Sequence, residues 1–178
     1  MRIISGKYGG RNIVAPGSLP VRPTTDFAKT GLFNILNNNF DFEETLVLDL
    51  FCGIGSISFE FASRGTPSVT SVDQNTGCIN FIKEYAQKLK DTAIHPVKSD
   101  AFDFINTYSQ QFDIVFADPP FDAESTDLLP QLILEKGLVK KEGWLIVEHQ
   151  SKRKLNSIYE PKQVRTYGNC AFSIFVMN

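Results

Sequence analysis

In the segment FADPPF, residues 116–121, a carboxylate precedes two adjacent prolines and an aromatic ring follows them. Its first two residues are also the last two of the apolar run FDIVFA, residues 112–117, which is typical of a buried strand. The two prolines must end that strand, because neither nitrogen can donate to a sheet ladder. The Asp118 carboxylate and the Pro119 carbonyl would therefore be two acceptors held rigidly at the strand end, beside Pro120 and Phe121.

Two fixed acceptors suit chemistry on the amino group of a base, whose lone pair is otherwise delocalised into the ring. If both N–H bonds point at the acceptors, the nitrogen turns pyramidal and becomes a nucleophile with little reorganisation. Phe121 offers a face on which a flipped base can stack. The alternative without chemistry is a proline-ended strand followed by a loop aspartate.

A second motif, VLDLFCGIGS at residues 47–56, has the pattern of a strand, a tight glycine turn and the start of a helix. Such a turn brings backbone N–H groups close to a ligand at the carboxyl end of a sheet. The third glycine of a dinucleotide fingerprint is missing, which argues against a pyrophosphate. Asp49, just before the turn, would also repel a pyrophosphate, but it suits the amino group of an amino-acid ligand.

Acidic residues also follow the next two predicted strands. Asp73 lies 20 residues after Gly53, at a position where a carboxylate accepts ribose hydroxyls. Asp100, followed by Ala101 and Phe102, suits the edge and face of adenine. Amino acid, sugar and base without phosphate describe S-adenosylmethionine, which we predict as the ligand. A generic α/β turn with surface aspartates is the alternative.

These motifs need a frame of alternating strands and helices to bring them together. From residue 45 onwards, short apolar runs such as TLVLDLF alternate with helical stretches such as TGCINFIKEYAQKLK. This alternation indicates βαβ units and a parallel sheet covered on both faces. The last two runs, KQVRTYG and CAFSIFVMN, are separated by the turn Gly168-Asn169, which predicts an antiparallel hairpin.

The beginning of the chain has a different pattern. RIIS and RNIVA flank the glycine-rich GKYGG, which predicts a β-hairpin. A helix follows, capped by Thr25 or Asp26. Its apolar positions, which we expect in the core, are Leu32, Phe33 and Leu36. We therefore predict a hairpin-and-helix extension at residues 1–40 and an α/β domain at residues 41–178.

Composition narrows the class of protein. The chain has 178 residues, of which 42% are hydrophobic, and this suits one soluble domain with a sizeable core. No apolar run approaches the roughly 18 residues of a membrane span, and the N-terminus has no signal-peptide pattern. Three separated cysteines and two histidines argue against a disulfide framework or a metal site. We expect a cytoplasmic, reduced protein without metal or membrane contact.

The net charge of −2 is unevenly distributed along the chain. Residues 1–40 carry a net charge of +4 and residues 150–178 another +4, whereas residues 41–149 carry −10. Basic ends can mark a surface that binds a polyanion such as RNA. Solvated surface charge is the plainer interpretation.

Basic residues surround the predicted hairpin turn. Arg2, Lys7 and Arg11 flank it, and Arg22 lies just before the first predicted helix. We expect the hairpin to lie on the ligand side of the sheet and to contact phosphates around a target loop. The alternative is that the hairpin covers a sheet edge and that RNA is recognised elsewhere, with residues 152–154 as candidates.

Together these motifs resemble a known family. DLFCGIG with Asp73, Asp100 and DPPF is similar to class I, Rossmann-like methyltransferases that act on amino groups. RIISGKYGGR, RPTTD, LFNIL, SRG and DPPF resemble the bacterial RsmD-type enzymes over nearly the whole chain. The resemblance implies a mostly parallel seven-stranded sheet with an antiparallel last strand. It also implies methyl transfer from S-adenosyl-L-methionine to N2 of a guanine in small-subunit (16S) ribosomal RNA, with a small-subunit particle as the partner.

Individual roles follow from the resemblance and the charge pattern. The expected cofactor-binding residues are Asp49, Phe51, Gly53, Gly55, Asp73, Gln74, Asp100 and Ala101. The expected target-amine site consists of Asp118, Pro119, Pro120 and Phe121. The expected RNA-contacting residues are Arg2, Lys7, Arg11, Arg22, Thr24 and Thr25. The sequence departs from the family at Phe27 and Thr30, where arginine and glutamate are common.

Three other functions fit part of the pattern. The nearest is an adenine-N6 methyltransferase of RNA or DNA, because a similar motif serves that amine. A protein glutamine methylase usually has asparagine at the position of Asp118, and the basic ends favour RNA. A catalytically idle RNA-binding assembly factor would not need the carboxylates Asp49, Asp73 and Asp118.

Two further residues are weaker candidates for chemistry. His149 could act as a base, but we expect it to pack or be solvated. We expect Cys52 to pack in the glycine turn.

Overall fold

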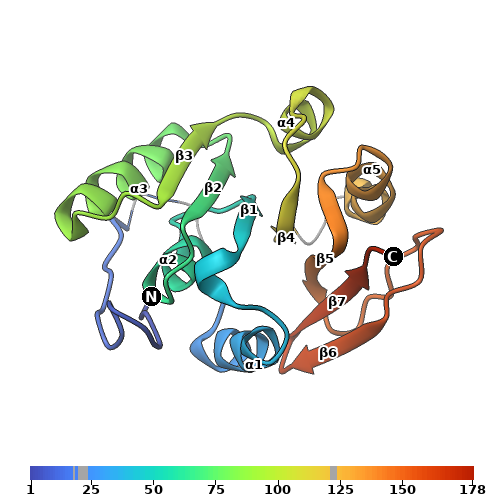
Figure 1. Cartoon of the computed structure of the whole chain (residues 1–178), viewed down its shortest axis with the longest axis horizontal. Coiled ribbons are helices and arrows are strands. Elements are labelled where there is room, and N and C mark those ends of the chain that lie inside the picture. Colours follow the sequence, from blue (N-terminus) through green and yellow to red (C-terminus); the bar gives the residue numbers. More distant parts are fainter. Residues whose placement is uncertain (18, 20–23, 121–123) are drawn as a thin grey trace.

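Within residues 1–17, 19, 24–120 and 124–178, which the computed structural model describes, the chain folds around a seven-stranded sheet (Figure 1). Its strands are β1 (Leu46–Leu50), β2 (Ser68–Asp73), β3 (Ile94–Lys98), β4 (Phe112–Ala117), β5 (Val139–Gln150), β6 (Gln163–Tyr167) and β7 (Cys170–Val176). Their order is β3-β2-β1-β4-β5-β7-β6. Strands β1 to β5 pair in parallel, and β7 runs antiparallel to both β5 and β6. The predicted mostly parallel sheet with an antiparallel last strand is confirmed.

Helices cover both faces of this sheet. They are α1 (Asp26–Asn37), α2 (Ser56–Ser63), α3 (Thr76–Leu89), α4 (Ala101–Thr107) and α5 (Leu129–Glu135), with short 3-10 helices η1 (Phe42–Glu44) and η2 (Glu124–Leu128). Figure 1 shows α1, α2 and α3 on one face and α4 and α5 on the other. Leu32, Phe33 and Leu36 of α1 are buried against the sheet, as predicted for core positions.

The alternation of side chains along the strands decides where the carboxylates point. Successive side chains of a strand point to opposite faces of its sheet. In β1, Val47 packs on the α1 side and Leu48 on the α4 side. Asp49 therefore points to the α1 side. In β5, Glu148 does the same, because it lies two residues after Ile146, which packs on the α1 side.

The N-terminal segment forms a hairpin-shaped loop instead of a regular pair of strands. Among the described residues, its one isolated β-bridge joins Arg2 and Asn12. Two further backbone N–H groups, of Ile4 and Ser5, donate to the carboxylate of Glu60 in α2 at 2.8 and 3.1 Å. Across the hairpin, Ile3 donates to the Arg11 carbonyl at 3.0 Å and Ile13 donates to the Met1 carbonyl at 2.8 Å. The predicted β-hairpin is therefore present as a short irregular pair, with its outer backbone donors bound to α2.

One predicted turn and one predicted helix cap are confirmed. β6 and β7 join at Gly168 and Asn169, with Tyr167 and Cys170 paired across the turn. Gly168 has a φ of 63°, a conformation that glycine adopts without strain. At the start of α1, Thr25 is the cap, and its side-chain oxygen accepts a hydrogen bond from a backbone N–H in the first helical turn.

Candidate active site

The turn after β1 has an unusual backbone. Phe51, Gly53 and Gly55 have φ angles of 59°, 52° and 79°. Phe51 is strained there, because only glycine adopts a positive φ freely, and such strain is typical of functional sites. The Cys52 N–H donates to the Val72 carbonyl at 3.0 Å, which ties the turn to β2. The turn is therefore fixed at the carboxyl edge of the sheet, where β1 to β5 end.

Asp49 lies directly beneath this turn and is 1% exposed. The Ser58 hydroxyl donates to its carboxylate at 2.5 Å and lies 2.7 Å from the Ser71 hydroxyl oxygen. Burial raises the pKa of Asp49 to about 7, against the hydrogen bond from Ser58, and the nearby charge of Asp73 adds to the rise. A buried carboxyl of this kind suits an ammonium group, which would favour its ionised form.

Asp73 connects the same turn to the end of β2. Its Oδ2 accepts the Gly53 N–H at 2.8 Å, and its Oδ1 accepts the Asn75 N–H at 2.8 Å. Each carboxylate oxygen has a second lone pair that can accept from a ligand hydroxyl. Gln74 follows and is exposed. Asp49, Asp73 and the strained turn thus come together as the sequence predicted.

Asp100 lies at the start of α4, beyond the end of β3. Its Oδ1 accepts the N–H groups of Phe102 and Asp103 at 2.8 and 3.2 Å, so the side chain caps the helix. Ala101 is buried beside it. The rings of Phe51 and Phe102 meet edge to face, with centroids 6.3 Å apart. These groups form an aromatic wall next to a carboxylate, which suits a planar base such as adenine.

Asp118 follows β4 and reaches the end of β1. Its backbone N–H donates to the Leu50 carbonyl at 3.3 Å, which brings it next to the glycine turn. Pro119 is buried and Pro120 is exposed, while Asp118 is partly exposed. Phe121 lies outside the described residues. The carboxylate that we predicted for an amine target therefore lies beside the residues that we predicted for the cofactor.

Glu148, which the sequence analysis did not select, is the neighbour of Asp118. Ala117 pairs with Val147 in the register of β4 and β5, so the next residue of each chain segment lies side by side. Glu148 is 4% exposed, and the Thr24 hydroxyl donates to its Oε2 at 2.8 Å. The feature of the sequence that indicates Glu148 is a carboxylate at the end of the apolar run WLIVEH, since this strand and the one before Asp118 both end at the same edge of the sheet.

The two carboxyl groups influence each other. Burial raises the pKa of Asp118 well above its usual value, and the negative charges of Glu148 and Asp49 add to the rise. Burial likewise raises the pKa of Glu148, while the hydrogen bond from Thr24 lowers it. Among the described residues, no basic side chain pairs with Asp118 or Glu148. Together with Asp49 they are three neighbouring carboxyl groups, which a ligand with N–H donors or a positive charge would stabilise.

The residues expected to contact RNA are separated in the structure. Thr24 is buried against Glu148, and Thr25 is the exposed cap of α1. Arg2 lies near them, with its Nε 3.4 Å from the Asp26 carboxylate. Arg22 lies outside the described residues. Arg2, Thr24 and Thr25 therefore border the Asp118 side of the site.

The expectation that the hairpin turn lies on the ligand side is wrong. The Lys7 N–H donates to the carbonyl of Ser63, the last residue of α2, at 2.7 Å, and the Lys7 Nζ lies 3.0 Å from the Asp91 carboxylate. Because α2 runs back from the carboxyl edge, its last residue lies at the opposite edge. Lys7 is at that edge, and Arg11 lies over the ring of Tyr8 in the same turn.

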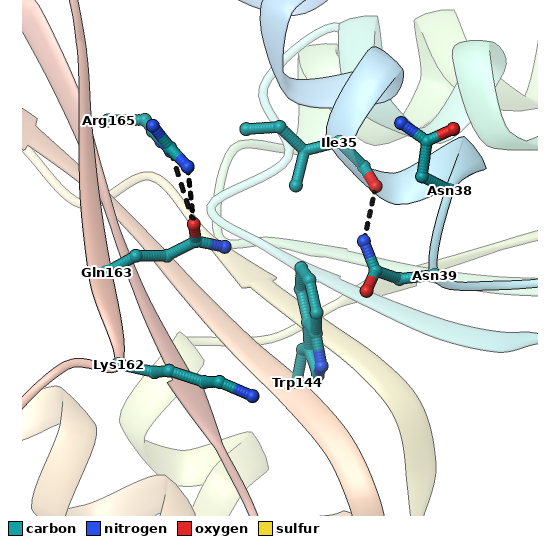
Figure 2. Close-up of a pocket in the computed structure, with 7 residues that line it drawn as sticks. All are labelled: Ile35, Asn38, Asn39, Trp144, Lys162, Gln163 and Arg165. Atoms are coloured by element: carbon teal, nitrogen blue, oxygen red, sulfur yellow. Dashed lines mark hydrogen bonds between the residues drawn. The ribbon is translucent and has the colours of Figure 1, made fainter.

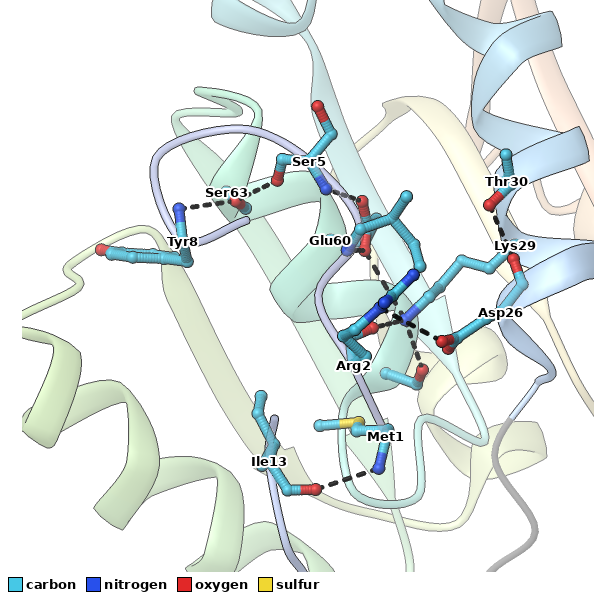
Figure 3. A network of polar contacts seen from close by, with 12 residues as sticks. Met1, Arg2, Ser5, Tyr8, Ile13, Asp26, Lys29, Thr30, Glu60 and Ser63 are labelled. Carbon is cyan, nitrogen blue, oxygen red and sulfur yellow. Dashed lines mark hydrogen bonds and ion pairs between the residues drawn. The ribbon is translucent and has the colours of Figure 1, made fainter. Parts of the chain in front are cut away.

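A buried polar cluster joins the N-terminal segment, α1 and α2 (Figure 3). Lys29 is 1% exposed, and its Nζ donates to the Arg2 carbonyl at 2.5 Å and to the Ser56 hydroxyl at 3.3 Å. The Nζ lies 3.5 Å from Glu60, which also accepts from Arg64 at 2.8 Å. Burial lowers the pKa of Lys29, against the attraction of Glu60. The cluster fixes the start of α1, and with it Thr24 and Thr25.

The two weaker candidates have structural roles. His149 is buried on the face opposite Glu148, with its Nε2 2.8 Å from the Ser173 hydroxyl, and burial lowers its pKa. Burial raises the pKa of the Cys52 thiol well above its usual value, which makes it a poor nucleophile. Both residues pack as we expected.

A surface pocket lies away from these residues, at the end of α1 and the start of β5 (Figure 2). Its lining residues are Ile35, Asn38, Asn39, Trp144, Lys162, Gln163 and Arg165. Internal hydrogen bonds, such as Asn39 Nδ2 to the Ile35 carbonyl at 2.7 Å, satisfy several of its polar groups. It contains none of the predicted site residues.

The described part of the chain contains neither a metal-binding cluster nor a membrane-spanning helix. No group of three or more His, Cys, Asp or Glu side chains there is arranged to hold a metal ion. No helix in the same residues has both the length and the apolar character of a membrane span.

The strand order, the strained glycine turn and the carboxylates at successive strand ends define a class I, Rossmann-like methyltransferase fold. A family model described as Conserved hypothetical protein 95 matches residues 1–176. The chain belongs to this family, and the resemblance to RsmD-type methyltransferases is confirmed.

Individual relatives agree with this assignment. A Buchnera aphidicola protein (subspecies Baizongia pistaciae) named Ribosomal RNA small subunit methyltransferase D is 31% identical over 165 residues, which cover 90% of this chain and 81% of the relative. The Haemophilus influenzae protein of the same name is 32% identical over 159 residues, covering 87% and 81%. The solved structure of the putative methyltransferase yhhF from Escherichia coli matches with a TM-score of 0.86 and 26% identity, covering 100% of this chain and 98% of that one.

Proposed function

We propose that the protein transfers a methyl group from S-adenosyl-L-methionine to the exocyclic N2 of a guanine in small-subunit ribosomal RNA. One observation carries the proposal. Asp118 donates its backbone N–H to Leu50, so the DPP segment lies directly beside the glycine turn and Asp49. A target amine held by that segment is next to a ligand held by the turn. The names of the relatives supply the RNA as the substrate class.

The residues at the turn fit S-adenosylmethionine. The buried Asp49 carboxyl suits the ammonium group, and the free lone pairs of Asp73 suit the ribose hydroxyls. The Phe51 and Phe102 rings, with Asp100 and Ala101, suit the adenine. When bound, this cofactor supplies a methyl group on a positively charged sulfur, which the surrounding carboxylates favour electrostatically.

Asp118 and Pro119 act on the target amine. The Asp118 carboxylate accepts one N–H bond of N2, and the Pro119 carbonyl accepts the other, which turns the nitrogen lone pair towards the methyl group. When N2 gains the methyl group it must lose one proton. Asp118 takes that proton, and its raised pKa suits this role.

The physiological substrate is ribosomal RNA within a small-subunit particle, in the cytoplasm and without a metal ion. The chain is short and its central residues carry a net negative charge, while both ends are basic. Site choice on a structured particle needs only a few phosphate contacts from such ends, because the particle itself presents the target loop.

The deciding experiment is tritiated methyl transfer to small subunits isolated from cells that lack this methylation, followed by nucleoside analysis. N2-methylguanosine at one position is the expected product. N6-methyladenosine would establish the adenine alternative. Absence of transfer to particles and naked RNA, together with RNA binding, would identify an idle assembly factor instead.

A further inference from the structure

Asp118 and Glu148 form one acceptor surface. They follow Ala117 and Val147, which pair in the parallel register of β4 and β5. Neighbouring strands lie about 4.8 Å apart, so two side chains on the same face at this register are in reach of one small ligand. Both point to the α1 side, beside Asp49.

Glu148 is held in place by hydrogen bonds, and no cation among the described residues pairs with it. Thr24, itself 8% exposed, donates its hydroxyl to Oε2 at 2.8 Å. Among the ion pairs of the described residues, none involves Glu148 or Asp118. Thr24 and the Cys170 thiol are neutral donors to Glu148. A carboxylate has about four lone-pair sites, so further acceptor capacity remains, and the DPP segment is the neighbouring surface.

The Watson–Crick edge of guanine presents three N–H bonds in a row, one on N1 and two on N2. Adenine instead presents an acceptor at N1 beside its amino group. We propose, on the basis of the function proposed above, that Glu148 accepts the N1–H of the target guanine while Asp118 and Pro119 accept the two N–H bonds of N2. Glu148 is then a specificity-determining residue.

This arrangement excludes adenine by leaving acceptors face to face. Adenine N1 would meet the ionised Glu148 carboxylate with no hydrogen between them, so either both lone pairs stay unsatisfied or Glu148 must take up a proton, and each costs free energy. A site built to hydrogen-bond an N–H group rejects an analogue that lacks it far more strongly than an apolar pocket rejects a missing methyl group.

The test uses an RNA whose mapped target guanine is replaced by 2,6-diaminopurine. This base keeps the N2 amine but has an acceptor at N1. We expect the wild-type enzyme to use the guanine RNA at least about a hundredfold better, measured as kcat/KM for methyl transfer. Glu148→Gln offers an amide donor to N1, so the preference for guanine should shrink by at least about tenfold. Comparing the two RNAs within each enzyme cancels any general loss of activity.

Glu142→Gln is the matched control, because Glu142 is exposed at the other end of β5. Its preference should equal that of the wild type. Equal use of the two RNAs by the wild-type enzyme would overturn the inference without any variant. An unchanged preference in Glu148→Gln would overturn it as well. If the wild-type enzyme does not methylate the guanine RNA at all, the proposed function itself fails.

Discussion

At the scale of single residues, a change at Asp118 should affect methyl transfer without affecting cofactor binding. Asp118→Ala should lower single-turnover methyl transfer by about a hundredfold or more, the usual scale for losing one preorganised polar group. Its affinity for S-adenosylhomocysteine should stay at the wild-type value, because in the proposed mechanism the side chain contacts the target amine and not the cofactor. Rapid-quench transfer assays and calorimetry measure the two quantities. Near-normal transfer by the variant would remove Asp118 from the mechanism.

Asp73 is expected to behave in the opposite way. S-adenosylhomocysteine at about 100 times its dissociation constant should stabilise the folded protein by about 2.7 kcal/mol, because it binds only the folded state. Asp73→Ala loses the ribose acceptors and the tie to Gly53, so the rise in Tm should largely disappear. Asp103→Ala, an exposed change in α4, serves as the control. Stabilisation by NADH and not by S-adenosylhomocysteine would contradict the cofactor assignment.

Asp49 should make cofactor binding depend on pH. Its pKa is about 7, so the carboxyl is protonated below that pH and must lose its proton to bind an ammonium group. Affinity for S-adenosylhomocysteine should therefore fall by up to about tenfold for each pH unit below 7. Titrations between pH 5 and 8 at constant ionic strength would show this slope. Asp49→Asn should bind more weakly and lose the slope, and an equally steep slope in that variant would point to another group.

The same pKa has the opposite effect on the protein without ligand. The folded-state pKa of Asp49 lies above the usual unfolded value of about 3.9, so the folded state binds more protons between these two values. The contribution of Asp49 to the free energy of unfolding is therefore fully present below about pH 4. It is lost as the pH rises through about 7. If Asp49 binds the ammonium group as proposed, ligand and proton compete for one buried carboxyl group.

At the scale of elements, the cluster of Lys29 and Glu60 holds the N-terminal segment on α2. Lys29→Met should lower the free energy of unfolding by about 3 kcal/mol, because a buried carboxylate loses a charged partner. Urea denaturation measures the free energy of unfolding of this variant. Lys88→Met is the control, because Lys88 is exposed on α3. A loss below about 1 kcal/mol would mean that Arg64 and the backbone donors satisfy Glu60 by themselves.

Local patterns made most elements predictable, together with the position of the glycine turn and of the aspartates at the strand ends. The glycine turn, the aspartates after strands and the terminal hairpin all depend on residues that are close in sequence. Glu148 was missed because its importance depends on the register of β5 beside β4, which pairs residues 30 positions apart. The position of the hairpin depends on Glu60 and Ser63, whose side chains have the appearance of ordinary helix surface in the sequence.

At the scale of the whole molecule, basic residues occur at both edges of the sheet. Lys152 and Lys154 are exposed just after β5 ends, at the carboxyl edge. Lys7 and Arg11 lie at the opposite edge. The division into an extension at residues 1–40 and a domain at residues 41–178 stays a prediction.

RNA binding across a salt series should distinguish these edges. Lys152→Ala/Lys154→Ala should weaken binding and flatten the plot of log affinity against log salt by about one unit for each lost phosphate contact. Lys7→Ala/Arg11→Ala should keep the wild-type slope, because that turn faces away from the target site. The reverse result would mean that the substrate wraps around the molecule to reach the amino edge.

The docking of the N-terminal segment on α2 has a consequence for the order of events during synthesis. Residues 1–13 leave the ribosome before Glu60, Ser63 and Asp91, which accept their hydrogen bonds. Ile3 and Ile13 therefore stay exposed on the nascent chain until α2 and α3 are available to cover them. Residues 1–13 therefore acquire their structure only after α2 and α3 are made, although they are synthesised before those helices.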